Sequence, residues 1–173
     1  AGAARLAAVI PAYRNDLEGL VAAVRDQTAI THNNGDVIAC AEFFARTVYA
    51  VLKGQSPTDA IENVLKLDFS NHPIAELVSQ GIQHRDRETL ETIAEFGQAC
   101  SLEAGLPGAI HLITRYSGDF KAAMVENVMA GGDSSARGIL AGMVLCAAQG
   151  MAAIPEKWIE EMTAAKRIAE LLK

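Results

Sequence analysis

Two adjacent glycines and three helix-capping residues lie two residues before the longest uncharged segment of the chain. Gly131 and Gly132 permit a sharp turn and a close approach to a neighbouring backbone, because glycine carries no side chain. The next residues, Asp133, Ser134 and Ser135, all favour the start of a helix. This order predicts a helix, a tight turn and then a largely buried helix, with carboxylate, hydroxyl and backbone N–H groups gathered at one point.

Two interpretations of this turn are open. The N–H groups at a helix N-terminus bind anions, and a carboxylate at the same place can help to hold Mg²⁺. The same residues also suit a simple N-cap, and their spacing alone does not separate the two interpretations. Arg137 lies one turn into the predicted helix, where its charge opposes the helix dipole. We therefore expect Arg137 to pair with Asp133 or with a bound phosphate.

Composition and periodicity favour helices throughout the chain. Half of the residues are hydrophobic and 21% are charged, which excludes a disordered chain. No segment alternates with the two-residue period of a strand, whereas helix-start signals recur at short intervals. We expect one all-α domain over residues 1–173, a multi-helix orthogonal bundle around a central apolar helix. The predicted helix starts are Asp16, Asn34 or Asp36, Ser56-Pro57, His72-Pro73, Asp86, Leu106-Pro107, Asp119, Asp133 and Ile154-Pro155.

Charge and cysteine usage exclude several classes of protein. The net charge is −6 and no basic patch is present, so nucleic-acid binding is not expected. Residues 138–155 form an uncharged run, but Gln149 and three glycines interrupt it and no aromatic belt flanks it, which argues against a membrane span. Cys40, Cys100 and Cys146 are far apart and form no CxxC pair. We therefore expect the three cysteines to be small core residues, and the protein to reside in the reducing environment of the cytoplasm.

A second polar segment, Thr31 to Asn34, lies in a short loop between two predicted helices. One interpretation is that His32 and Asn33 offer an imidazole and an amide to a sugar or nucleotide, and the other is an ordinary capped loop. His111 stands between apolar residues, which predicts a hydrogen-bonded core histidine. The chain contains no HExxH pair, GxSxG elbow or P-loop, so it offers no other familiar catalytic motif.

These motifs resemble the C-terminal signature of the ADP-ribosylglycohydrolase family. The resemblance covers most of this chain but only about the C-terminal half of a full family member. Its most specific part is a Gly-Gly-Asp turn, an apolar small-residue helix and an Ile-Pro-x-x-Trp segment. The matching residues are Gly131-Gly132-Asp133 and Ile154-Pro155-Glu156-Lys157-Trp158, with Thr31-His32, Gly54 and Leu106-Pro107 in fitting order.

The resemblance implies an all-α enzyme that commonly holds two Mg²⁺ or Mn²⁺ ions and cleaves the glycosidic bond between ADP-ribose and an acceptor. Asp133 matches the first aspartate of the family's C-terminal metal motif, whereas Ser135 replaces the second aspartate and Ala136 the hydroxyl residue. The N-terminal acidic metal motif has no counterpart in these 173 residues. Two divalent ions need several anionic oxygens. Magnesium at Asp133 therefore requires ligands from another polypeptide, or the site holds one weakly bound metal or none.

The first functional hypothesis is that the chain binds or hydrolyses ADP-ribosyl groups of a small molecule or of a modified protein. Asp133 would contact a metal or a ribose hydroxyl. The alternative is a non-catalytic helical module, as in the J-type crystallins that share the family's fold. Half of a family fold should also leave apolar surface uncovered, so we expect a homo-oligomer or a companion chain. The expected ligand-binding residues are His32, Asn33, Gly131, Gly132, Ser134, Ser135 and Arg137.

Overall fold

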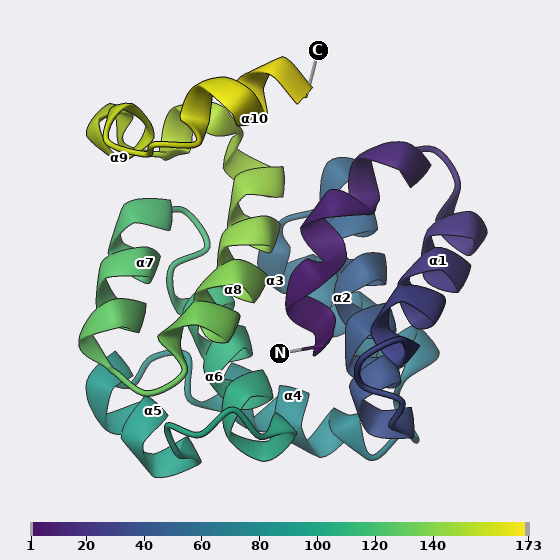
Figure 1. The fold of residues 1–173 in the computed structure, drawn as a ribbon. Coiled ribbons are helices and arrows are strands. Elements are labelled where there is room, and N and C mark those ends of the chain that lie inside the picture. The colour runs from purple at the N-terminus through teal and green to yellow at the C-terminus, as the bar shows by residue number, and fades with distance from the viewer. Residues whose placement is uncertain (1, 172–173) are drawn as a thin grey trace.

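Helices follow one another with short connections through residues 2–171, the part of the chain that the computed structural model describes (Figure 1). No strand occurs within these residues, so the predicted all-α class is confirmed. The first and last helices are short, and the long ones lie between residues 17 and 149. In chain order the elements are η1 (Gly2–Ala8), η2 (Ile10–Tyr13), α1 (Leu17–Ala29), α2 (Gly35–Leu52), α3 (Pro57–Asp68), α4 (Ile74–Gln83), α5 (Thr89–Phe96), α6 (Leu102–Arg115), α7 (Phe120–Met129), α8 (Ser134–Gln149), η3 (Met151–Ala153), α9 (Glu156–Glu160) and α10 (Ala165–Leu171).

Side-chain caps explain why most of these helices begin where the sequence predicted. The Asp16 carboxylate accepts a hydrogen bond from the backbone N–H of Gly19, and Asn34 and Ser56 cap α2 and α3 in the same way. Asp119 and Asp133 do so for α7 and α8. Each cap satisfies a backbone donor that the helix itself leaves unpaired.

Three predicted boundaries are wrong. α5 begins at Thr89 after Glu88 rather than at Asp86. α6 begins at Leu102, and Pro107 lies inside it, where burial of residues 106–114 compensates for the missing N–H. Gly150, with φ +72°, rather than Ile154-Pro155, ends α8. Beyond Pro155 the chain forms two short helices, α9 and α10, instead of one.

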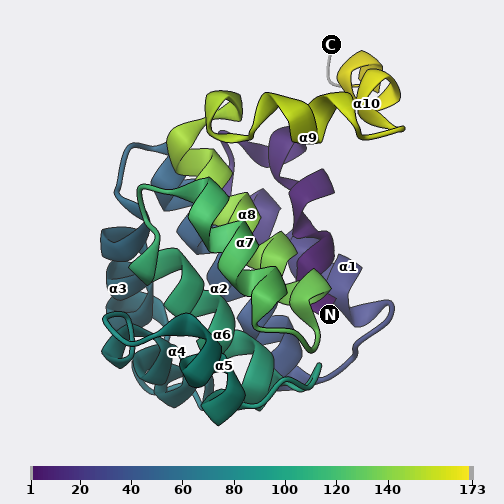
Figure 2. The same ribbon diagram turned by 90° about the vertical axis from the view of Figure 1, so that its left-hand side faces the viewer.

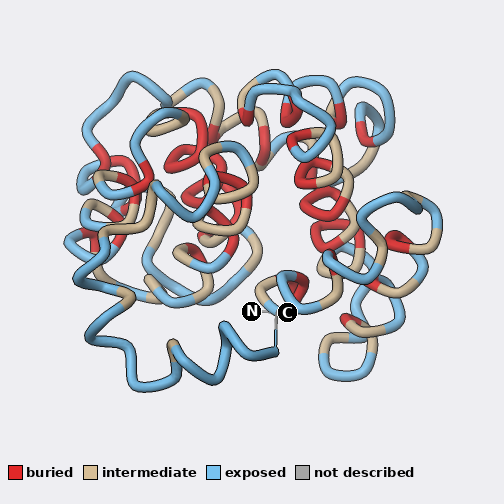
Figure 3. The backbone as a smooth tube through the Cα atoms, turned by 90° about the horizontal axis from the view of Figure 1, so that it is seen from above, coloured by how far each residue is buried: buried red, intermediate tan, exposed pale blue. Residues whose placement is uncertain are grey.

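The core is shared by α2, α6 and the inner face of α8. The side chains of α6 are buried without interruption from residue 106 to residue 114. In contrast, α8 buries one face, whereas Ile139 on another face is 43% exposed. The expectation that the apolar run of α8 forms the central helix is therefore not confirmed. Figure 3 shows the buried segments of the bundle facing inward and the C-terminal segment exposed at its edge.

Small residues on α8 allow α7 to pack closely alongside it, as Figures 1 and 2 show. A Cβ atom at Gly138 would come within 2.8 Å of the Asn127 amide nitrogen, and one at Gly142 would contact the Phe120 ring. Beyond α8, α9 and α10 turn away from the core, and Trp158 packs on Phe120 with ring centroids 6.3 Å apart. None of the helices described within residues 2–171 combines the length and the apolar character that crossing a membrane requires.

Candidate functional site

The turn between α7 and α8 is held against the loop that follows α5. Gly131 and Gly132 have φ angles of +69° and +64°. The backbone N–H of Asp133 donates to the Gln98 carbonyl at 2.9 Å, and the Gln98 amide donates to the carbonyl of Ala130. A Cβ atom at Gly132 would overlap the carbonyl and Cβ atoms of Gln98. The two glycines therefore give both the turn and the close backbone approach that the sequence predicted.

Asp133 caps α8 and at the same time borders a cavity. Its Oδ1 atom accepts a hydrogen bond from the N–H of Ala136 at 3.2 Å, and its side chain is half-buried. The N-cap interpretation of Asp133 is thus confirmed. Its cap role does not exclude a ligand role, because a carboxylate can accept several hydrogen bonds.

Arg137 is buried, with 1% of its surface exposed. Its Nε atom donates to the Asn127 side-chain oxygen at 3.2 Å, and Nη2 donates to the backbone carbonyls of Asn127 and Gly131. Among residues 2–171, Nη1 has no hydrogen-bond partner. Burial lowers the pKa of the guanidinium, and the charge of Asp133 opposes that shift. The charge of Asp133 therefore acts on Arg137 through space, while the direct hydrogen bonds of Arg137 go to Asn127 in α7 and to Gly131 in the α7–α8 turn.

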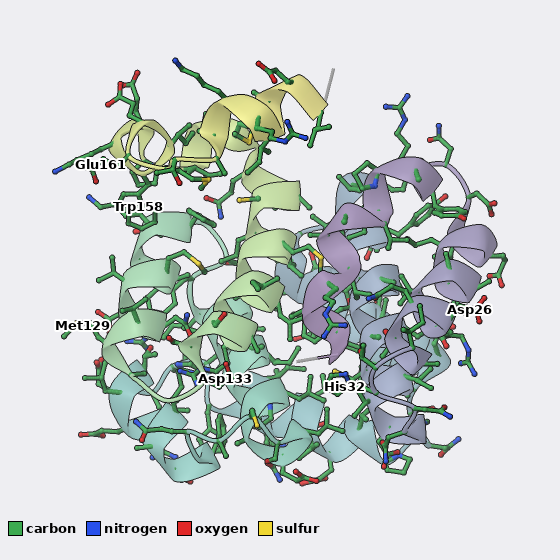
Figure 4. All side chains as sticks on the ribbon, in the orientation of Figure 1. Asp26, His32, Met129, Asp133, Trp158 and Glu161 are labelled. Atoms are coloured by element: carbon green, nitrogen blue, oxygen red, sulfur yellow. The ribbon has the colours of Figure 1, made fainter. Side chains whose placement is uncertain are left out.

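A cavity of about 260 Å³ lies beside the first turns of α8. It brings together Asp133, Arg137 and His32, the last about a hundred residues away in sequence. In Figure 4, Asp133 lies at the start of α8 and His32 lies across from it, before the start of α2. The Thr31 hydroxyl lies 2.9 Å from Nδ1 of His32 and orients its ring. The lining residues are Gly2, Ala3, His32, Val37, Cys40, Cys100, Ser101, Leu102, Gly105, Leu106, Asp133, Ala136, Arg137 and Leu140.

The other expected ligand-binding residues lie outside the lining of this cavity. Asn33 and Ser135 are exposed, and Ser134 is half-buried at the first position of α8. Gly131 and Gly132 shape the turn that precedes Asp133. A direct ligand contact by any of these five residues stays a prediction.

Sequence reasoning missed Gln98 and Asn127, which hold the site together. The amide of Gln98 bonds a carbonyl 32 residues away, and Asn127 bonds Arg137 ten residues away. Asn127 also donates to the carbonyl of Ser134 at 2.8 Å, which ties α7 to the first turn of α8. Neither residue belongs to a local motif, so no spacing rule indicates it.

The cavity does not offer the ligands of a dinuclear magnesium centre. Within residues 2–171, no three side chains of the His, Cys, Asp and Glu types lie close enough together to hold a metal ion. Asp133 supplies the single carboxylate among the described lining residues. Two divalent ions would need more anionic oxygens than this. Magnesium binding at Asp133 stays a prediction that depends on ligands from elsewhere.

The three cysteines differ in their surroundings. Cys40 is buried and Cys146 is half-buried, whereas Cys100 is exposed and lies at the cavity, so the prediction of a core residue is wrong for Cys100. Burial raises the pKa of the Cys40 thiol to about 12 and also raises that of Cys146. A thiol reacts as its thiolate, so both should alkylate slowly.

We expect iodoacetamide at neutral pH to modify Cys100 first, because its side chain is accessible to the reagent. Peptide mass spectrometry over a time course measures the order of modification. The variant Cys100→Ser is the control and should remove the fast phase. Faster modification of Cys40 than of Cys100 would contradict the burial described above.

Similarity to a known protein family extends over the whole chain. A family model described as ADP-ribosylglycohydrolase matches residues 1–173. Crystallin J1B from Tripedalia cystophora is 25% identical over 142 residues, which are 82% of this chain and 43% of that protein. The chain thus spans less than half the length of this relative.

Proposed function

The chain belongs to the ADP-ribosylglycohydrolase family, and from this membership we propose that the cavity at the start of α8 binds an ADP-ribosyl group. One observation carries the proposal. Asp133, the position that matches the family's metal motif, lines a cavity together with Arg137 and with His32 from a distant loop. A concave, mostly apolar site with a few convergent polar groups is the usual form of a small-molecule site.

In this proposal Asp133 accepts a hydrogen bond from a ribose hydroxyl and His32 borders the same pocket. The cavity is slightly smaller than the range of about 300–1,000 Å³ that is common for ligand pockets. It therefore suits one part of ADP-ribose, and the remainder would lie over the rim near Ser134 and Ser135. The reaction we propose is hydrolysis of an N- or O-glycosidic ADP-ribosyl bond, on a small molecule or a modified protein.

Isothermal titration of the folded chain with ADP-ribose tests the binding proposal directly. The titration is run once with Mg²⁺ and once with EDTA. Saturable heat under either condition supports binding. An absence of heat under both conditions, from a sample whose folding is verified by circular dichroism, would refute it.

Two substitutions of Asp133 separate a ligand role from a cap role. Asp133→Ala removes both the cap and the carboxylate and should lower the free energy of unfolding by about 1 kcal/mol. Asp133→Asn keeps a good cap and should leave stability nearly unchanged. We expect both variants to lose affinity for ADP-ribose in titration. Unchanged affinity in both would show that Asp133 only caps the helix.

The crystallin relative favours a second candidate function, a non-catalytic helical module that works structurally or in an assembly. Apolar residues exposed on α7, Val125, Val128 and Met129, are consistent with a second copy or a companion chain as partner. The three free cysteines suit the reducing environment of the cytoplasm.

A further inference from the structure

The imidazole of His32 is held by the N-terminal element η1 as well as by its own loop. Nη1 of Arg5 donates a hydrogen bond to the Thr31 hydroxyl at 2.8 Å, and that hydroxyl lies 2.9 Å from Nδ1 of His32. The backbone of Gly2 packs against the base of the same ring, since a Cβ atom added at Gly2 would lie 3.1 Å from Cβ and Cγ of His32. Residues of η1 therefore reach His32 in two ways, directly from Gly2 and through Thr31 from Arg5.

The direction of these hydrogen bonds determines which ring nitrogen of His32 carries the proton. A guanidinium can only donate, so the Thr31 oxygen accepts from Arg5. The positive charge polarises the hydroxyl, which makes it a better donor and a poorer acceptor. We therefore expect Thr31 to donate its proton to Nδ1 of His32, and the neutral ring to carry its own proton on Nε2.

The edge of the His32 ring that is left for the cavity is the edge that contains Nε2. Nδ1 faces the Thr31 hydroxyl and the Cγ side lies against Gly2, while the half-buried residue lines the cavity. Asp133, in the same lining, supplies a carboxylate, which can only accept hydrogen bonds. An Nε2–H group on His32 would give the cavity a donor to complement this acceptor. Neither Arg5 nor Thr31 is among the described residues that line the cavity.

We propose that Arg5 and Thr31 are positioning residues that hold His32 as a neutral hydrogen-bond donor, through Nε2–H, to an oxygen atom of the bound ligand. The proposal rests on the proposed function, in which that ligand is an ADP-ribosyl group. Arg5 and Thr31 act on binding through His32 and need no contact with the ligand. The relay gives η1 a role in the site although its one charged side chain lies outside the cavity.

The position of the His32 proton can be measured without a ligand. Long-range proton–nitrogen correlation spectra of the folded chain at mildly alkaline pH show which ring nitrogen is protonated, and the loss of signals in His32→Gln assigns them. We expect the proton on Nε2. His111 is the internal control, because its Nδ1 faces the carbonyl of His84, which can only accept, so its proton should lie on Nδ1. A proton on Nδ1 of His32 would overturn the inference, whether or not ADP-ribose binds.

Titration with ADP-ribose measures the effect of the relay on binding. Thr31→Val replaces the hydroxyl with a methyl group of similar size and should weaken binding by about 3- to 10-fold, the effect of one hydrogen bond. Thr31→Ser keeps the hydroxyl, so this matched control should restore most of the affinity. Arg5→Met removes the charge that polarises Thr31 and should also weaken binding. Circular dichroism verifies that each variant is folded.

A double-mutant cycle shows whether Thr31 acts through His32. His32→Gln places an amide near the position of Nε2 and leaves no acceptor at the position of Nδ1, so Thr31→Val should cause no further loss of affinity in this background. No loss in Thr31→Val, equal losses in Thr31→Val and Thr31→Ser, or the same loss with and without His32 would overturn the inference and leave the proposed function intact. No binding of ADP-ribose by the wild type would refute the proposed function, and the spectra would still decide the position of the proton.

Discussion

Gly132→Ala is expected to lower the free energy of unfolding by about 2–4 kcal/mol. Part of the loss is conformational, because alanine at a φ of +64° adopts a left-handed backbone that costs about 1–2 kcal/mol. The rest is steric. The new Cβ atom would overlap the carbonyl of Gln98 and lie 2.8 Å from its Cα atom. Backbone atoms move less readily than the end of a side chain, so the loop or the turn must shift.

Gly131→Ala is the matched control, since Gly131 belongs to the same turn and has a φ of +69°. Its nearest neighbour would be the Gln98 amide nitrogen at 3.4 Å, an ordinary contact. We expect it to lose only the conformational part, about 1–2 kcal/mol. Urea unfolding with linear extrapolation measures both variants. Equal losses would mean that the contact between Gly132 and Gln98 does not constrain the turn.

The same substitution should also affect the cavity, because the Asp133 N–H that bonds Gln98 belongs to the residue after Gly132. A shift of the turn displaces the carboxylate from its place in the lining. We therefore expect Gly132→Ala to weaken ADP-ribose binding more than Gly131→Ala does. A larger loss of ADP-ribose affinity in Gly132→Ala than in Gly131→Ala would show that the glycine turn positions Asp133 for the proposed function.

Local chemistry was sufficient to predict the helix starts with side-chain caps. The oxygens of Asp16, Asn34 and Ser56 bond backbone N–H groups two or three residues ahead, so a short segment contains the whole interaction. Pro107 shows where local rules fail. Proline usually marks a helix start, yet burial of the surrounding side chains extends α6 five residues upstream to Leu102. Packing of this kind depends on distant segments and leaves no mark in local spacing.

In the candidate site, too, local features were predictable from the sequence and contacts between distant segments were not. The Gly-Gly-Asp turn and the cap at Asp133 follow from neighbouring residues, and the sequence predicted both. The partners of Arg137 did not follow, because Asn127 and the Gly131 carbonyl reach it only when α7 folds back on α8. From the sequence we expected Asp133 or a phosphate as the partner of Arg137. In the structure its hydrogen-bond partners are Asn127 and Gly131. His32 lies beside Asp133 in the cavity lining only because the tertiary fold brings their two loops together.

His111 is buried and hydrogen-bonded, so the prediction of a core histidine is confirmed. Its Nδ1 atom donates to the carbonyl of His84 at 3.1 Å, and Nε2 lies 3.0 Å from the Thr89 hydroxyl. The carbonyl can only accept, so the neutral ring uses Nε2 as the acceptor of the Thr89 proton. Burial lowers the pKa of His111 from 6.5 to about 4, and the neighbouring charges of Arg115, His84 and Arg87 act in the same direction.

This lowered pKa should make the fold less stable as the pH falls from about 7 to 4. In that interval the unfolded chain binds a proton at His111 and the folded chain does not, so acid favours unfolding. The shift from 6.5 to about 4 corresponds to a loss of about 3 kcal/mol that is complete below pH about 4. Urea unfolding at several pH values measures this loss of stability, and His111→Gln is the control, since glutamine keeps hydrogen-bonding groups without titrating.

The difference in pH dependence between the wild type and His111→Gln isolates the histidine from the carboxylates that also protonate in acid. Identical slopes for the two proteins between pH 7 and 4 would show that His111 is not held in its neutral form by the fold.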